Sequence, residues 1–221
     1  MPSKARKAFD ENAKDIEKLL RLHEQEGGTA KGRRFGLEVL NKSAIVLITS
    51  YWEAYCEDIA AEALEHLVKH LKDAANLPVE LKKQVAKELK NDPHDLAVWK
   101  LSGSGWSKHL KSRLNDLRQE RSRRLNTPKY SNIDGLFHSA IGVADISCSW
   151  TWARKMTVAR ARKKLDKYVT LRGEIAHRGK AAKSVKKADA VDYFDFIQKV
   201  AGKTGGAVNT HVKRATGKAL W

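Results

Sequence analysis

The chain has 221 residues, of which 42% are hydrophobic and 31% charged, an ordinary balance for one soluble globular domain. Its formal charge of +17 at pH 7 makes nucleic acid the expected class of partner. The longest apolar stretch, residues 44–52, is too short to cross a bilayer, and the first residues lack the apolar core of a signal peptide. These features exclude a membrane-spanning protein and predict a cytoplasmic location.

Apolar residues recur every three or four positions almost throughout, with only four prolines, so the pattern predicts an all-α helical bundle. The helix expected at residues 35–71 is long enough to be the central pillar of the core. We expect one domain over residues 1–221, with an N-terminal helix and loop (1–34), a core bundle (35–203) and a short C-terminal extension (204–221). In chain order, helices are expected at 4–24, 35–71, 78–89, 106–124, 133–140, 150–171 and 188–203, with a last short helix after Gly205 and Gly206.

Two segments carry the positive charge. Residues 100–129 hold nine basic and two acidic side chains, and residues 154–187 hold thirteen basic and two acidic. Such a concentration creates a local field that attracts polyanions. The alternative is that these are solvated faces that only aid solubility. The candidate RNA-binding residues lie in these two segments and are Lys111, Arg113, Arg118, Arg121, Arg162, Lys163 and Lys180.

The second basic segment contains the motif Arg-Gly-Glu-Ile-Ala-His at residues 172–177. A guanidinium can hold a phosphate with two hydrogen bonds and stabilise charge that develops on it. An imidazole, with a reference pKa of about 6.5, exchanges protons near neutral pH. Arg172 and His177 are therefore candidate catalytic residues for RNA cleavage that needs no metal and no cofactor.

The same residues also allow a structural interpretation. Arg172 can pair with a carboxylate such as Glu53, and His177 can cap the turn at Gly179. Glu174 can orient His177 or pair with Arg178, so Glu53, Glu174 and Arg178 are candidate supporting residues.

The spacing Leu165-x3-Val169-x2-Arg172-x4-His177 resembles the signature of the HEPN superfamily, in which Arg and His follow an amphipathic helix. Residues 51–58, 133–146 and 217–221 are similar, in the same order, to blocks of the RiboL-PSP type of HEPN domain. The chain departs from the common pattern at Gly173, because a polar residue, frequently Asn, usually follows the Arg.

The resemblance implies a helical bundle that forms a homodimer, in which the Arg and His of both protomers meet in a cleft. Many HEPN proteins cut single-stranded RNA without a metal, often as toxins or in phage defence, and an antitoxin or other partner can restrain them. Others are inactive binding modules. The resemblance thus predicts either a metal-independent endoribonuclease that uses 2′-hydroxyl attack, or a non-catalytic module for RNA binding or dimerisation. A DNA-binding regulator is a third alternative, although no helix-turn-helix spacing stands out.

Helical geometry constrains the motif. In an unbroken helix, five steps of about 100° leave Arg172 and His177 about 140° apart, on different faces. Either Gly173 marks a break in the helix that lets the two side chains converge, or the site is assembled across a dimer.

Overall fold

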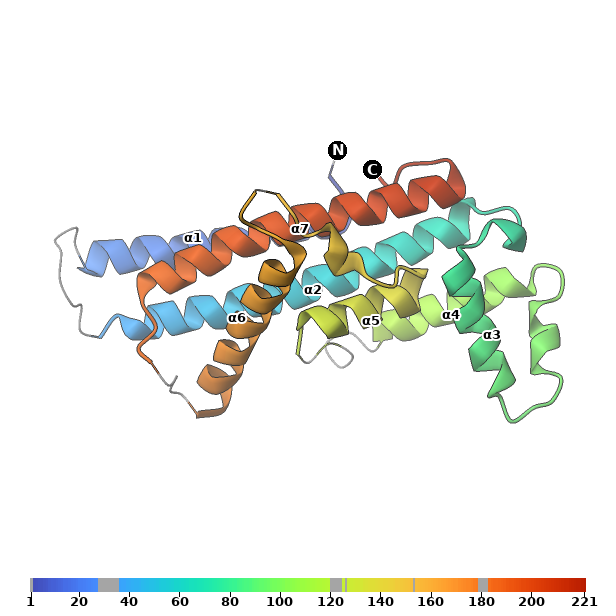
Figure 1. Cartoon of the computed structure of the whole chain (residues 1–221), viewed down its shortest axis with the longest axis horizontal. Coiled ribbons are helices and arrows are strands. Elements are labelled where there is room, and N and C mark those ends of the chain that lie inside the picture. The colour runs from blue at the N-terminus through green and yellow to red at the C-terminus, as the bar shows by residue number, and fades with distance from the viewer. Residues whose placement is uncertain (1, 28–35, 120–124, 126, 153, 179–182) are drawn as a thin grey trace.

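The computed structural model describes residues 2–27, 36–119, 125, 127–152, 154–178 and 183–221. These residues form seven α-helices and three short 3₁₀ helices without a β-strand, which confirms the predicted all-α fold (Figure 1). The last part of the helix expected at 106–124, residues 120–124, lies outside the described residues. The helices are α1 (Lys4–Gly27), α2 (Glu38–His70), η1 (Ala74–Asn76), α3 (Val79–Lys90), η2 (Ala97–Leu101), α4 (Gly105–Gln119), α5 (Tyr130–Ile141), η3 (Ile146–Ser149), α6 (Val158–Arg178) and α7 (Lys187–Thr216).

Helix α2 is the centre of the bundle, as its length predicts. It packs against α1, α4, α5, α6 and α7, and it buries far more than one narrow stripe of its surface. Helices α1, α2 and α7 lie side by side, and α6 is steeply inclined to them (Figure 1). The position of α6 matters for function because this helix carries the Arg-His motif.

Buried polar side chains fix how the long helices pack. The Glu62 carboxylate accepts hydrogen bonds from the backbone N–H groups of Lys4 (3.1 Å) and Ala5 (3.0 Å), and so caps α1 from α2. The hydroxyls of Thr49 and Tyr193 are both buried, lie 3.0 Å apart, and join α2 to α7. Because a buried polar group is costly without its partner, these pairs specify the arrangement of the helices.

The glycines at positions 205 and 206 do not end a helix, contrary to the prediction. Helix α7 continues through both, so most of the predicted C-terminal extension belongs to it. A Cβ atom at Gly205 would lie 2.6 Å from the hydroxyl of Tyr55, which donates a hydrogen bond to the Ala201 carbonyl at 2.9 Å. The missing side chain lets α7 approach α2 closely, and this packing outweighs the low helix propensity of glycine.

Helix α6 begins and ends later than the predicted helix at 150–171. Trp150 lies before it, fully buried, in the connection from η3. Its indole N–H donates to the hydroxyl of Thr204 at 2.9 Å, which anchors this connection to α7. An apolar residue that anchors a loop has the same sequence signal as one on a helix face, so the pattern places the helix start too early.

Gly142 ends α5 in a left-handed conformation, with φ of 76°. Its N–H donates to the carbonyl of His138, and the next N–H donates to Phe137, which satisfies two carbonyls at the helix end. A Cβ atom here would lie 2.6 Å from the backbone nitrogen of Leu81 in α3. Glycine is thus required both by the backbone angle and by the contact between α5 and α3.

Gly142→Ala is expected to destabilise the protein more than Gly217→Ala. Both glycines follow a helix with positive φ, but a Cβ atom at Gly217 meets no atom within 4 Å. Gly217→Ala should cost about 1 kcal/mol of unfolding free energy from the backbone angle alone. Gly142→Ala should cost about 1–3 kcal/mol more because the α3 backbone must move. Urea unfolding of both variants measures the difference, and equal losses would contradict the close approach of α3.

Candidate functional site

The inner face of α6 is apolar and holds the helix against α2 and α7. Its fully buried side chains recur at helical spacing and include Leu165, Tyr168 and Val169. The rings of Tyr168 and Tyr193 stack with centroids 4.2 Å apart, and the Tyr168 hydroxyl donates to Asp192 at 2.7 Å. This packing determines which residues of the motif face inward.

Arg172 follows the buried stripe and is partly buried itself. Its positive charge lowers the pKa of Glu53 of α2 and of Tyr193 of α7, so the guanidinium lies near both side chains. The buried Nε atom of Arg172 has no hydrogen-bond partner among the described residues. A buried donor without a partner carries an energetic cost that a purely structural arginine would avoid.

Glu53 is the carboxylate suggested from the sequence as a partner for Arg172; the arginine's charge acts on it, but the described residues show no ion pair between the two side chains. Burial, with a smaller contribution from the neighbouring Glu57, raises the pKa of Glu53 to about 7, although the charge of Arg172 opposes the rise. Glu57 is only 5% exposed. Arg172 thus lies near the half-buried Glu53, whose carboxyl has a pKa close to neutral pH, and the buried Glu57 is a second negative charge that acts on Glu53.

His177 lies on a different side of α6 and is exposed. The helix is unbroken through Gly173, so the break considered from the sequence is absent. Ideal helix geometry then separates Arg172 and His177 by about 140° around the axis and about 7.5 Å along it. The two motif residues of one protomer do not converge.

Of the supporting residues, Glu174 is partly exposed and lines a groove beside α6. Arg178 is the last residue of α6, and its side chain lies outside the described residues. Gly179, the turn that His177 could cap, also lies outside them.

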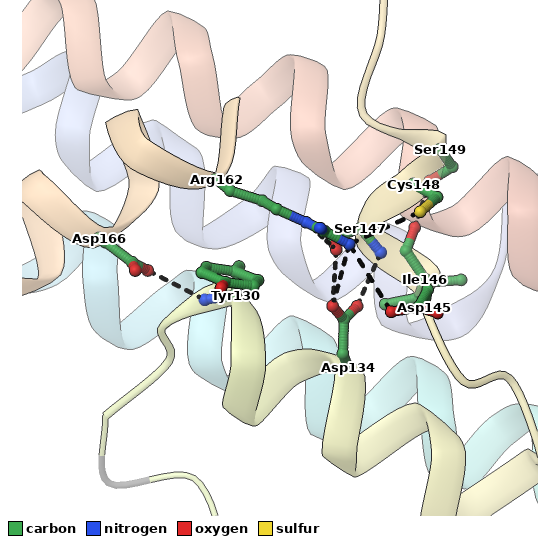
Figure 2. A network of polar contacts seen from close by, with 9 residues as sticks. All are labelled: Tyr130, Asp134, Asp145, Ile146, Ser147, Cys148, Ser149, Arg162 and Asp166. Carbon is green, nitrogen blue, oxygen red and sulfur yellow. Dashed lines mark hydrogen bonds and ion pairs between the residues drawn. The ribbon is translucent and has the colours of Figure 1, made fainter. Parts of the chain in front are cut away.

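Arg162 forms the centre of a polar network between α6, α5 and η3 (Figure 2). Its Nε donates to the Ser147 hydroxyl at 2.8 Å, and its guanidinium lies 3.5 Å from the Asp134 carboxylate. Ser147 donates to Asp134 through both its backbone N–H (2.8 Å) and its hydroxyl (2.7 Å). The guanidinium also covers the ring of Tyr130, with 4.9 Å to the centroid. Arg162 therefore has a structural role in the protomer, a role that no local sequence signal indicated.

The other predicted RNA-binding residues fall into three groups. Arg113 and Arg118 form ion pairs with Glu88 and Glu65, respectively. Lys111 and Lys163 are exposed. Arg121 and Lys180 lie outside the described residues. Among the described members of this set, Lys111, Lys163 and Arg118 are exposed, and Arg118 is engaged in an ion pair.

Within the described ranges, no group of three or more His, Cys, Asp or Glu side chains could hold a metal ion. No helix in the part of the chain that the structure describes is both long and apolar enough to cross a membrane.

Replacing Glu53 by Gln should change how stability depends on pH. The folded-state pKa of about 7 exceeds the ordinary value of 4.5, so ionisation of Glu53 destabilises the fold as the pH rises from 4.5 to above 7. Glu53→Gln removes this loss and should gain about 1 kcal/mol relative to wild type between about pH 5 and about pH 8, after allowance for partial exposure.

Urea unfolding of wild type and Glu53→Gln at both pH values provides the measurement. Glu17→Gln, at an exposed position of α1, controls for the loss of a carboxylate. A difference between Glu53→Gln and wild type that does not change with pH would contradict the raised pKa.

Comparison with known proteins identifies the family of the chain. A family model described as RiboL-PSP-HEPN matches residues 10–209, a range that contains Glu53, Arg172 and His177. No curated protein and no solved structure is significantly similar to the chain. The matched range covers most of the 221 residues. The chain therefore belongs to the RiboL-PSP-HEPN family of helical domains, which are ribonuclease-like or RNA-binding modules.

Proposed function

We propose that the protein is a metal-independent endoribonuclease that cleaves single-stranded RNA. The observation that carries this proposal is the environment of the motif on α6. Arg172 is held beside Glu53 with a buried, unpartnered Nε, and His177 is exposed near the end of the same helix. Membership of the HEPN family supports the same activity. A role as a toxin or phage-defence effector, restrained by an antitoxin or other regulatory partner, is part of this proposal because many HEPN ribonucleases act in this way.

The proposed reaction is attack of a ribose 2′-hydroxyl on the adjacent phosphate. His177 takes the proton from the 2′-oxygen as general base, which typically contributes 10²- to 10⁴-fold. The bond from phosphorus to the 5′-oxygen breaks, and this oxygen receives a proton from a general acid. Arg172 stabilises the negative charge that develops on the phosphorus oxygens. The products are a 2′,3′-cyclic phosphate and a 5′-hydroxyl.

We also propose that the active site is composite and forms in a homodimer. Arg172 and His177 lie on different sides of an unbroken helix, so one protomer does not present both to one phosphate. In a symmetric dimer, the same surface of both protomers meets at the two-fold axis. The two histidines can then act as base and acid, while an arginine from either protomer stabilises the phosphate.

Arg172→Ala and His177→Ala should each abolish cleavage. The assay is incubation of the purified protein with end-labelled single-stranded RNA in excess EDTA, with analysis of the product ends. Losses of about 10²-fold or more are expected from removal of a general base or a charge-stabilising group. His94→Ala, at an exposed histidine between α3 and α4, is the matched control and should cut normally.

Intact RNA with the wild type would contradict the nuclease, as would equal cleavage by both motif variants. RNA that is bound in a salt-sensitive manner but left uncut would support the alternative of a non-catalytic RNA-binding module. The glycine at position 173, where the family usually has a polar residue, is the feature that favours this alternative.

A mixture of the two inactive variants tests the composite site. Heterodimers of Arg172→Ala and His177→Ala contain one intact arginine and one intact histidine, on different protomers. Mixing the variants should therefore restore part of the cleavage activity that each lacks alone. The mixture is unfolded, refolded together and compared with each variant treated in the same way. A mixture as inactive as its components would contradict a shared site in which one arginine and one histidine from different protomers suffice for partial activity.

A further inference from the structure

A groove of about 1220 Å³ runs along the outer side of α6. One wall is α6 itself, from Val158 to Glu174, and the other is the segment 183–186 with the start of α7. Tyr130, at the start of α5, closes one part of it. The volume is in the range of sites that bind small molecules or parts of polymers.

Hydrogen bonds hold the walls of this groove in place. The backbone N–H of Val185 donates to Glu38 at 3.0 Å, and the side chain of Asn41 donates to the Val185 carbonyl at 3.0 Å. Both partners belong to α2, so the segment 183–186 is fastened to the centre of the bundle. The N–H of Tyr130 donates to Asp166 of α6 at 3.1 Å. These hydrogen bonds fix the two walls of the groove relative to the rest of the bundle.

The groove combines an apolar floor with a basic rim. Apolar surface comes from residues such as Val158, Leu171 and Val185. Lys163, Lys167, Lys183 and Lys186 contribute to its lining, and all four are exposed.

The lysines of the rim are not neutralised. Within the part of the chain that the structure describes, Lys163, Lys183 and Lys186 form no ion pair, whereas Lys164 and Lys187 next to them pair with Asp192 and Glu24. The groove also has three carboxylates, of which Asp166 accepts from the backbone of Tyr130 and Asp189 from the backbone of Lys186. Glu174 is the third. Cations therefore outnumber anions around the groove.

Helical register connects the groove to the motif. Ala159 and His177 are 18 residues apart, which is five full turns, so they lie on the same line along α6. Asp166 and Thr170, which also line the groove, fall within about 20° of this line. His177 thus lies beyond the Glu174 end of the groove, about 10 Å along the axis from Thr170. A strand bound in the groove is directed towards His177.

We propose that this groove binds the part of the single-stranded RNA that adjoins the cleaved phosphate. The inference deepens the proposed ribonuclease function and rests on it. The exposed lysines contact phosphates, and the apolar floor formed by Val158, Leu171 and Val185 receives an unstacked base. Single-stranded RNA fits because it offers negative charge and an exposed apolar base face within one ligand.

The test compares two triple variants that lose the same charge. The rim variant, Lys163→Gln/Lys183→Gln/Lys186→Gln, removes three lysine charges at the groove. The control variant, Lys69→Gln/Lys90→Gln/Lys199→Gln, removes three exposed lysine charges elsewhere. Binding of a fluorescein-labelled, unstructured RNA oligonucleotide is measured by anisotropy at several salt concentrations, with His177→Ala in every protein. The histidine change prevents cleavage, so the binding result does not depend on whether the protein is a nuclease.

The rim variant should bind at least about tenfold more weakly than the control variant. Its plot of log affinity against log salt should be shallower by about 2, because each lost phosphate contact to a single strand contributes about 0.7. With His177 restored, the rim variant should raise KM far more than it lowers kcat. Equal weakening of binding by both triple variants would overturn the proposal that the groove binds RNA, while leaving the nuclease proposal intact. If the rim variant loses RNA binding as expected but the wild type does not cleave RNA, the nuclease proposal alone would be overturned.

Discussion

Burial of the Asp134 carboxylate is the constraint on which the position of α6 depends. This side chain is 8% exposed, and burial raises its pKa against the opposing effects of Ser147 and Arg162. A buried carboxylate is tolerated when hydrogen bonds and an opposite charge compensate for lost water. The compensating groups come from η3 and α6, so one carboxylate on α5 joins three segments (Figure 2). With the first half of α6 anchored there, the second half carries the motif across the bundle.

The same network explains why net charge is an incomplete guide to a binding surface. Residues 154–187 hold thirteen basic side chains, but Arg162 is used to neutralise Asp134, and Lys164 to pair with Asp192. Exposed neighbours such as Lys163 are oriented outward by the same helix. Consecutive residues of a helix point in different directions. Lys164 therefore pairs with an acidic side chain of the protein, whereas the adjacent Lys163 is exposed to solvent. A count along the sequence adds both kinds together, and only the tertiary structure distinguishes them.

The sequence predicted the features that depend on local pattern. Helical periodicity gave the all-α fold and the central position of α2, and the motif identified Arg172 and His177 as the residues to examine. The helix end expected before Gly205 was wrong, and of the two alternatives considered at Gly173 the break is absent, because tertiary packing and helix cooperativity outweigh the weak propensity of a single glycine. The environment of Glu53 and the groove beside α6 could not be predicted, since both depend on contacts between segments more than 100 residues apart in the chain.

The division of the motif between two sides of α6 has a consequence for control of the proposed activity. In one protomer, Arg172 is partly buried near Glu53 of α2, while His177 is exposed to solvent. Under the proposed mechanism, neither residue completes a site until a second protomer approaches. Catalysis then depends on association, and therefore on protein concentration and on any partner that covers the same surface. Because the inner face of α6 is already packed against α2 and α7, association need not rebuild the core. It needs only to bring two preformed surfaces together.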